Sequence, residues 1–405
     1  MKRLLFVGDA GCPSGFARAT HEILDRVRFE YDVTVLGMNY RGDPHDHPYP
    51  IYAAAAGGDS LGVGRLIWMC DLVQPDVIVI QQDGWFIPYY IKKLRERAAT
   101  GEYKYPQHAA VPVVASLAVD GKHFQGAWIQ DVSLAIFWTQ FGLSEARIGG
   151  YAGQAKVIPL GVDLDTFHPV VRDGALERQK ATALRGKFIV GNVNRNQPRK
   201  RWDLTVKYFA EWVHSRQIQD AMLFLHSAPT GDESVNVLQL AKYYGIIDKL
   251  ALCQPETFYG NLDEDVCDTY NCFDVDITTT QGEGMGLTTL EAMACGVPCI
   301  VPEWAALGDW AKGAAEMVPC TSTALQSPGL SVIGGVADEL KFVEALDRLY
   351  RNRARLSALG EAGLKRVQEP CYRWQAIGEE WIKALDALLA PPEAVDDELW
   401  QEVTG

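Results

Sequence analysis

Two glutamates in a glycine-rich segment are the side chains best suited to chemistry in this sequence. The segment covers residues 280–298, and its three glycines precede an expected helix over residues 287–294. The first turn of that helix would offer unpaired backbone amides to an anion. Glu283 precedes the helix, and Glu291 lies near its end, where a carboxylate opposes the helix dipole. Because a carboxylate accepts two hydrogen bonds, the pair suits the vicinal hydroxyls of a sugar or ribose.

A second glycine-rich segment, residues 8–17, follows the first apolar run of the chain. Its glycines would let the backbone approach an anion, and a helix starting near Gly15 would direct free N–H groups at it. Ser14 and Gly15 are therefore candidate donor contacts. The segment has neither the Gly-x-Gly-x-x-Gly pattern of dinucleotide-binding folds nor the Gly-Lys-Ser/Thr of a P-loop. A plain strand–helix turn is the alternative interpretation.

Both segments lie among strand-like apolar runs that alternate with amphipathic helical runs. This pattern is typical of parallel sheets covered on both faces. The runs form two series, at residues 3–7, 32–36, 77–80, 111–117, 134–138 and 156–159, and at residues 187–193, 221–226, 249–253, 275–278 and 298–301. Two series predict two Rossmann-like, doubly wound α/β domains that face each other across a cleft. In such domains ligands bind beyond the carboxyl ends of the strands.

The length of 405 residues also predicts two domains. A polar stretch over residues 163–185 marks the boundary between a first domain at residues 1–162 and a second at residues 163–371. Residues 372–390 are expected to form one long helix, because aromatic and aliphatic residues recur in it at helical spacing. Residues 391–405 form an acidic tail.

Composition and charge narrow the class of protein. The formal charge of −14 argues against a surface that tracks nucleic acid or anionic lipid, although the basic stretch at residues 92–97 leaves a local acceptor-side or membrane-touching patch open. No apolar run approaches the roughly 20 residues that cross a bilayer, and residues 1–9 fit a first strand better than a signal peptide. Nine scattered cysteines without a Cys-x-x-Cys pair indicate buried free thiols. We therefore expect a cytoplasmic protein.

The segment around the two glutamates resembles the retaining GT-B glycosyltransferases of family 4, the glycosyl transferases group 1. Their hallmark is a Glu, seven residues and a second Glu, followed by Ala-Met-Ala-x-Gly-x-Pro. Here Glu283 and Glu291 precede the run AMACGVP at residues 292–298. Residues 157–163 resemble the interdomain segment of that family, and the helix with Trp374 resembles its C-terminal helix that crosses back onto the first domain. The resemblance is specific for the superfamily and not for one activity.

The resemblance implies a donor site in the second domain. Glu291 would hold the ribose hydroxyls, and Glu283 would hold the hydroxyls of the transferred sugar. Groups around the start of the helix between them would face the sugar and the distal phosphate, namely Gly284, Met285, Gly286, Leu287 and Thr288.

In this family an Arg and a Lys about five residues apart grip the diphosphate after the first strand of the second domain. That stretch is NRNQPRKR at residues 194–201, which makes Arg195 and Lys200 the candidates, with Arg199 or Arg201 as alternatives to Lys200. Two fixed cations would stabilise the charge that builds on a departing nucleoside diphosphate. A solvated basic turn is the other interpretation.

One position departs from the family pattern. The family often has a His after the fourth strand of the first domain, where it reaches the donor sugar. Asp120 stands in that position here, with His123 close by. An Asp could bind a sugar hydroxyl or orient the acceptor, and a turn or helix-cap Asp is the alternative. The substitution leaves the donor identity and the detailed mechanism open.

These features predict a retaining glycosyltransferase that moves a hexose from a nucleotide-diphosphate sugar to a hydroxyl acceptor. The favoured acceptor is a sugar or glycan, with a lipid carrier or a hydroxymethylated DNA base left open. No metal or other cofactor is expected, because the Asp-x-Asp sequences at residues 163–165 and 274–276 fall in the linker and at a strand edge. A nucleotide-sugar epimerase on the same scaffold and a degenerate binding protein are the rival interpretations. An epimerase would alter the donor without an acceptor.

Overall fold

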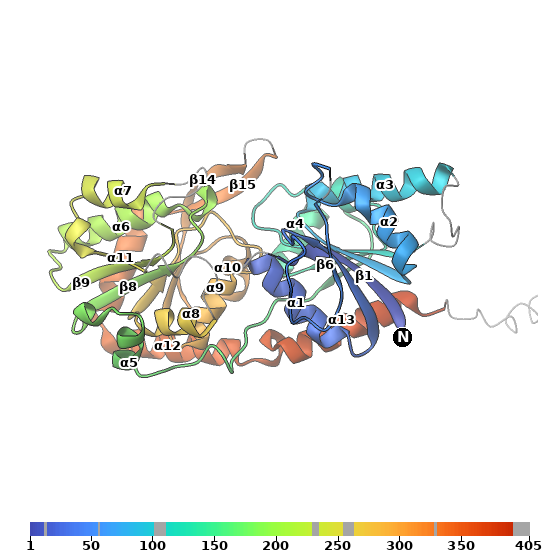
Figure 1. Cartoon of the computed structure of the whole chain (residues 1–405). Coiled ribbons are helices and arrows are strands. Elements are labelled where there is room, and N and C mark those ends of the chain that lie inside the picture. Colours follow the sequence, from blue (N-terminus) through green and yellow to red (C-terminus); the bar gives the residue numbers. More distant parts are fainter. Residues whose placement is uncertain are drawn as a thin grey trace, which may run out of the picture.

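The structure is a computed structural model that describes residues 1–11, 14–55, 57–100, 111–228, 235–253, 263–327 and 330–391. Two α/β domains lie side by side in it, each built on its own parallel sheet (Figure 1). The predicted fold class of two Rossmann-like domains is therefore confirmed. Among the described residues, no helix combines the length and the apolar character that crossing a membrane requires.

The first domain is built on a seven-stranded sheet with the order β3-β2-β1-β4-β5-β6-β7. Its strands are β1 (Lys2–Asp9), β2 (Tyr31–Met38), β3 (Ile51–Ala53), β4 (Val77–Gln81), β5 (Val113–Leu117), β6 (Leu134–Phe137) and β7 (Ala155–Val157), and its helices are α1 (Gly15–Val27), α2 (Val63–Val73), α3 (Ile87–Thr100) and α4 (Gln140–Ile148). Successive strand residues point to opposite faces. Leu4 and Phe6 join the core on the α1 side, and Leu5 and Val7 join the core on the α2 and α3 side. Burial on both faces explains why these strands are continuous apolar runs.

The second domain repeats this plan with a six-stranded sheet in the order β10-β9-β8-β11-β12-β13. The strands are β8 (Phe188–Val193), β9 (Ala221–His226), β10 (Leu250–Leu252), β11 (Val275–Ile277), β12 (Cys299–Pro302) and β13 (Glu316–Val318). The helices are α5 (Arg172–Arg178), α6 (Trp202–Ser215), α7 (Val237–Tyr243), α8 (Asp263–Asn271), α9 (Leu287–Ala294), α10 (Ala305–Trp310), α11 (Glu339–Arg351) and α12 (Arg353–Val367).

A separate antiparallel hairpin follows β13, formed by β14 (Cys320–Ser327) and β15 (Val332–Ala337). It belongs to neither parallel sheet. The apolar runs of the sequence did not predict it, because β14 reads CTSTALQS and carries mainly small polar residues. Strands β3 and β13 were missed as well.

Helix α13 (Trp374–Leu389) leaves the second domain and packs on α1 of the first, as Figure 1 shows at the bottom of the view. Trp381 and Leu385 are buried in this contact. Gly378 permits it, because a Cβ at that position would lie 2.4 Å from Cβ of Arg26. The hydroxyl of Tyr31 donates to Oδ1 of Asp386 at 2.8 Å. The chain thus passes between the domains twice.

Candidate functional site

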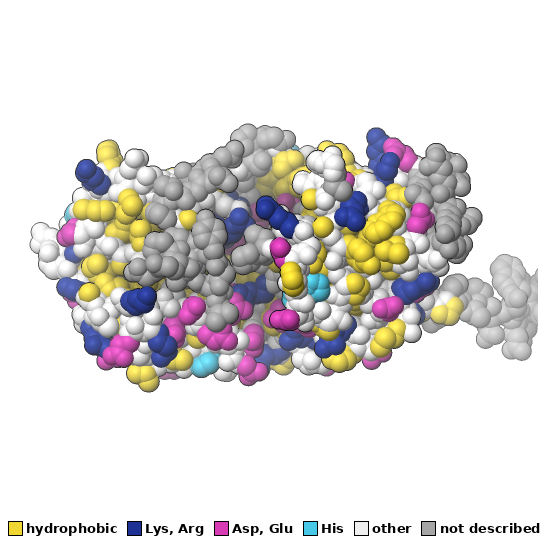
Figure 2. Space-filling model, in the orientation of Figure 1, with side chains coloured by type: hydrophobic (Ala, Val, Ile, Leu, Met, Phe, Trp, Pro, Cys, Tyr) yellow, Lys and Arg dark blue, Asp and Glu magenta, His cyan; other side chains and the backbone are white. Residues whose placement is uncertain are grey.

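The candidate site lies where the loops after several strands of the two domains meet. The first domain contributes the loops after β1, β4 and β5, and the second contributes the loops after β8 and β11. Since parallel strands end at one edge of a sheet, the two carboxyl edges face each other here. The surface is hollowed between the domains, and charged side chains gather at this hollow (Figure 2).

Glu283 is the centre of a charged cluster in this region. Its side chain is 9% exposed, and its carboxylate accepts from Nζ of Lys200 at 2.5 Å and from Nη1 of Arg199 at 3.1 Å. Burial alone would raise the pKa of Glu283, but the charges of Lys200 and Arg199 outweigh it and lower that pKa to about 2. Burial lowers the pKa of Lys200 to about 8, although Glu283 opposes this shift. Two cations and one anion therefore share a desolvated site.

A short turn brings Arg199 and Lys200 to Glu283. The segment Pro198–Lys200 forms a 3-10 turn that ends on Arg201 with φ of 51°. Arg195 is exposed, and its carbonyl accepts from Nε1 of Trp202 at 3.0 Å. Within the described residues, the Arg195 side chain makes no hydrogen bond or ion pair. Lys200 and its sequence alternative Arg199 are thus brought to Glu283, and Arg195 is not.

Asp120 approaches the cluster from the first domain. Nε of Arg199 lies 3.7 Å from Oδ2 of Asp120, which joins the two domains by an ion pair. Burial raises the pKa of Asp120, with Arg199 opposing and Glu283 reinforcing the shift. The Asp that stands in place of the family's His therefore faces the cations of the second domain.

Asp83 is a site residue that the sequence reasoning missed. It directly precedes the 3-10 turn Gly84–Phe86 that follows β4. Burial, and then the charge of Asp120, raises the pKa of Asp83 to about 7 although Arg199 opposes this. A signal existed, since Asp83 comes two residues after the apolar run of β4 at the carboxyl edge of the sheet.

Glu291 forms a second cross-domain contact. Its side chain is 8% exposed and accepts from the hydroxyl of Tyr270 at 2.9 Å. Nε of Arg18, on α1, lies 3.7 Å from Oε1 of Glu291, and the same guanidinium makes two hydrogen bonds to Asp263 at 2.5 and 3.0 Å. Burial raises the pKa of Glu291, while Arg18 and Tyr270 favour its ionised form. Arg18 was not predicted, because only the tertiary fold brings α1 to α9.

Glycines allow the loop at residues 280–286, which precedes α9 and is called the donor loop below for its proposed role, to touch the first domain. A Cβ on Gly282 would lie 1.7 Å from the carbonyl oxygen of Asp120, and one on Gly284 would lie 2.6 Å from Cβ of Ala118. Gly286 has φ of 89° and caps the start of α9, which exposes the first amides of that helix, those of Leu287 and Thr288. Met285 is buried, and its carbonyl accepts from Nε1 of Trp310 at 2.7 Å.

The first glycine loop is positioned beside the start of α9. The hydroxyl of Ser14 caps α1 by accepting from the amide of Ala17 at 3.1 Å, and it donates to Asp9 at 2.7 Å. A Cβ on Gly15 would lie 3.4 Å from the side chain of Leu287. Two helix N-termini from different domains therefore converge.

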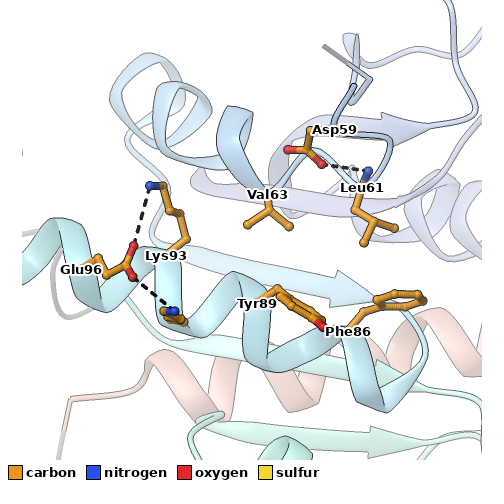
Figure 3. Close-up of a pocket in the computed structure, with 8 residues that line it drawn as sticks. Asp59, Leu61, Val63, Phe86, Tyr89, Lys93 and Glu96 are labelled. Carbon is orange, nitrogen blue, oxygen red and sulfur yellow. Dashed lines mark hydrogen bonds and ion pairs between the residues drawn. The ribbon is translucent and has the colours of Figure 1, made fainter. Parts of the chain in front are cut away.

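The basic stretch at residues 92–97 lies on α3, next to a pocket of about 520 Å³ between α2 and α3. Figure 3 shows Leu61 and Val63 facing Phe86 and Tyr89 across it. Lys92 and Lys93 line it too, and each pairs with Glu96, at 3.8 and 3.7 Å. The positive charge of this stretch is therefore partly neutralised.

The two Asp-x-Asp sequences are engaged in local structure. Oδ1 of Asp163 accepts from the amide of Asp165 at 3.0 Å. Asp274 accepts two hydrogen bonds from Arg172, both at 2.9 Å. Within the described ranges, no group of three His, Cys, Asp or Glu side chains is arranged to hold a metal ion.

Comparison with known proteins places this geometry in context. A family model described as glycosyl transferases group 1 matches residues 187–352. A D-inositol 3-phosphate glycosyltransferase of Geodermatophilus obscurus is 29% identical over 248 residues, 60% of this chain and 48% of that protein. A GDP-mannose-dependent monoacylated alpha-(1-6)-phosphatidylinositol monomannoside mannosyltransferase of Corynebacterium glutamicum is 28% identical over 242 residues, 57% of this chain and 55% of that protein. The matches span about half the length of these curated relatives.

Solved structures resemble the whole fold. Sucrose-phosphate synthase from Thermosynechococcus elongatus superposes with a TM-score of 0.76 at 18% identity and covers 96% of this chain and 99% of its own. Anabaena Alr3699/HepE, solved with UDP and glucose, gives a TM-score of 0.71 at 15% identity, with 96% and 100% covered. The shared architecture is the GT-B arrangement of two Rossmann-like domains.

Proposed function

Since a family model described as glycosyl transferases group 1 matches residues 187–352, we propose that this chain moves a sugar from a nucleoside diphosphate sugar to a hydroxyl acceptor with retention of configuration. The observation that carries the proposal is the Glu283 cluster. It places two cations against the buried carboxylate of Glu283, with the Asp120 carboxylate of the other domain beside Arg199. The family match and the relatives' names support transfer over epimerisation.

The proposed chemistry follows from where charge develops. The bond between the anomeric carbon and the β-phosphate oxygen breaks, and the acceptor oxygen bonds to the same face of that carbon. The acceptor proton passes to the departing phosphate oxygen, so no side-chain base is needed. Arg199, Lys200 and the amides of Leu287 and Thr288 would stabilise the growing negative charge. This scheme requires no metal ion or other cofactor.

The two domains would bind different substrates. In the second domain, Glu283 would bind hydroxyls of the transferred sugar and Glu291 would bind the ribose. In the first domain, Asp120 and Asp83 would face the acceptor. A sugar or glycan is the acceptor that such carboxylates fit best, because each carboxylate accepts from paired hydroxyls. Turnover with a lipid-linked acceptor or with hydroxymethylated DNA, and none with sugars, would contradict the assignment of a sugar or glycan as the acceptor.

Donor binding is tested by a thermal-shift panel of UDP, GDP, ADP and their sugars. A ligand at 100 times its dissociation constant should stabilise the wild type by about 2.7 kcal/mol. Glu291→Ala should remove this stabilisation by the preferred nucleotide, because the ribose hydroxyls lose the carboxylate that accepts their hydrogen bonds. The fold should survive, since Arg18 keeps its two hydrogen bonds to Asp263. Glu361→Ala, on the exterior of α12, is the matched control and should keep the wild-type response. No shift with any nucleotide would reject the proposed function.

The roles of the basic residues can be separated by single substitutions. Arg199→Ala should lower kcat/KM by about 100-fold, because it removes a cation from the Glu283 cluster. Arg195→Ala tests the sequence assignment, and we expect a smaller loss because Arg195 is exposed outside that cluster. Steady-state kinetics with the donor selected by the panel measure both. A larger effect at Arg195 would mean that its side chain turns onto the diphosphate.

A further inference from the structure

The β14–β15 hairpin connects the two walls of the candidate site. The amide of Lys122 donates to the carbonyl of Ile333 at 2.9 Å, and the amide of Ile333 donates to the carbonyl of Lys122 at 3.1 Å. This pair forms an antiparallel bridge between the domains. Lys122 follows β5 by five residues and Asp120 by two. The hairpin thus extends the second domain onto the segment that carries Asp120.

A bulge directs one side chain of the hairpin at that segment. Leu325 pairs with Ile333 and Ser327 pairs with Val332, so the register shifts at Gln326. A β-bulge inserts an extra residue and changes the direction of its side chain. Nε2 of Gln326 donates to the carbonyl of Asp120 at 2.9 Å.

The same hairpin is attached to the donor loop. The amide of Gly335 donates to the carbonyl of Gln281 at 2.8 Å, two residues before Glu283. A Cβ on Gly282 would lie 2.7 Å from Nε2 of Gln326 as well as 1.7 Å from the carbonyl of Asp120. The hairpin therefore contacts both loops that present carboxylates to the cations.

The fit between hairpin and first domain is close. A Cβ on Gly121 would lie 2.6 Å from Cγ1 of Val332 and 2.7 Å from the carbonyl of Ile333. Nδ1 of His123 lies 3.1 Å from the carbonyl of Ser331. Nζ of Lys122 lies 4.7 Å above the ring of Trp304, which follows β12. Each residue from Gly121 to His123 thus has a partner in the second domain.

We propose that the β14–β15 hairpin is a positioning element of the transfer site, and that Gln326 acts through the Asp120 backbone to hold the Asp120 carboxylate against Arg199. This inference rests on the proposed function. The hydrogen bonds of the hairpin to residues 120–123 require the two domains to lie as close together as they do in this structure, which we call the closed arrangement. The Asp120 side of the site is therefore complete only in the closed arrangement. Gln326 and Ile333 are positioning residues, since neither faces the reacting atoms.

The test compares Gln326→Met, which removes the donor at similar length, with Gln326→Lys, which retains a donor. Gln375→Met on the exposed face of α13 is the matched control. We expect Gln326→Met to lower kcat by about tenfold or more, because small displacements of a positioning group are costly to turnover. The KM for the panel-selected donor should stay within about twofold of the wild type, because most of the proposed donor contacts lie in the second domain. Gln326→Lys should recover most of the loss, and Gln375→Met should have no effect.

Hydrogen exchange supplies a readout that does not depend on activity. In Gln326→Met, peptides covering residues 118–124 and 330–336 should exchange faster, whereas peptides covering β8 should not change. Gly121→Val should give the same pattern by steric separation. An unchanged kcat in Gln326→Met, with normal donor binding, would contradict the positioning role and leave the proposed function intact. Failure of the wild type to bind any donor would reject the proposed function and the positioning role together. Unchanged exchange in both variants would contradict the bridge itself.

Discussion

Replacing Glu283 by glutamine is expected to destabilise the protein by about 3 kcal/mol at neutral pH, because removing one partner of a buried ion pair leaves its counter-charge uncompensated. Lys200 loses its anion in this variant, and Arg199 keeps only the more distant Asp120 at 3.7 Å. The additional change Lys200→Met should restore part of the stability, since it removes the cation left without a partner. Chemical denaturation of the single and double variants gives the coupling energy directly.

The matched control is Glu339→Gln at an exposed ion pair. Glu339 and Lys207 are 2.5 Å apart with side chains 38% and 39% exposed, and exposed pairs contribute about 0–1 kcal/mol. Equal losses in the Glu283 and Glu339 variants would show that the Glu283 cluster is solvated and contributes little.

The pH dependence of the wild type follows from the same cluster. The pKa of Glu283 is about 2 in the folded protein and lies near its ordinary value of about 4.3 in the unfolded chain. The unfolded state therefore takes up this proton first on acidification. The stabilisation from Glu283 is complete above pH 4.5 or so and is lost as the pH falls toward 2. Glu283→Gln should lose this component, so the difference in stability between the two proteins should shrink with acid.

Replacing Gly282 by alanine is expected to lower kcat by about 100-fold or more, because a displacement on the order of 1 Å at a reacting centre has an effect of this size. The new Cβ would lie 1.7 Å from the carbonyl of Asp120, which is backbone and cannot rotate away. The domains must separate to relieve the overlap, and Asp120 then moves away from Arg199.

Domain separation can be measured apart from catalysis. Small-angle scattering of Gly282→Ala should show a larger radius of gyration than that of the wild type. The thermal shift with the nucleoside diphosphate should persist, since most of the proposed donor contacts belong to the second domain. Gly64→Ala on α2, where a Cβ would meet only ordinary contact at 3.4 Å, is the control. A fully active Gly282→Ala protein would show that the closed arrangement is not the one that turns over.

The parts of the fold that the sequence predicted share one physical property. Strands such as β1 and β8 are buried on both faces and therefore appear as continuous apolar runs. Strand β14 of the hairpin is polar and largely exposed, so its pattern does not stand out from a loop. It nevertheless carries Gln326, which touches Asp120. A hydrophobicity pattern cannot reveal an element whose partners are backbone groups of another domain.

The residues of the candidate site likewise fall into those that the sequence identified and those that only the structure showed. Glu283 and Glu291 were identified because their local setting of glycines and apolar residues is unusual for a carboxylate. The choice among Arg195, Arg199 and Lys200 could not be made from spacing, since it depends on the 3-10 turn before Arg201. Asp83 depends on the alignment of two strand ends in space. The sequence showed which residue types could form the site, but it did not show in which direction each side chain points.

The return of α13 to the first domain bears on how the polypeptide is made. Nζ of Lys2 and the hydroxyl of Tyr31 both donate to Asp386, across 384 and 355 positions of sequence. During translation the surface of the first domain that receives this helix stays uncovered until residues 374–389 have left the ribosome. Contacts of such long range slow folding and expose intermediates to aggregation. Early release of the nascent chain would leave a half-molecule that chaperones must hold.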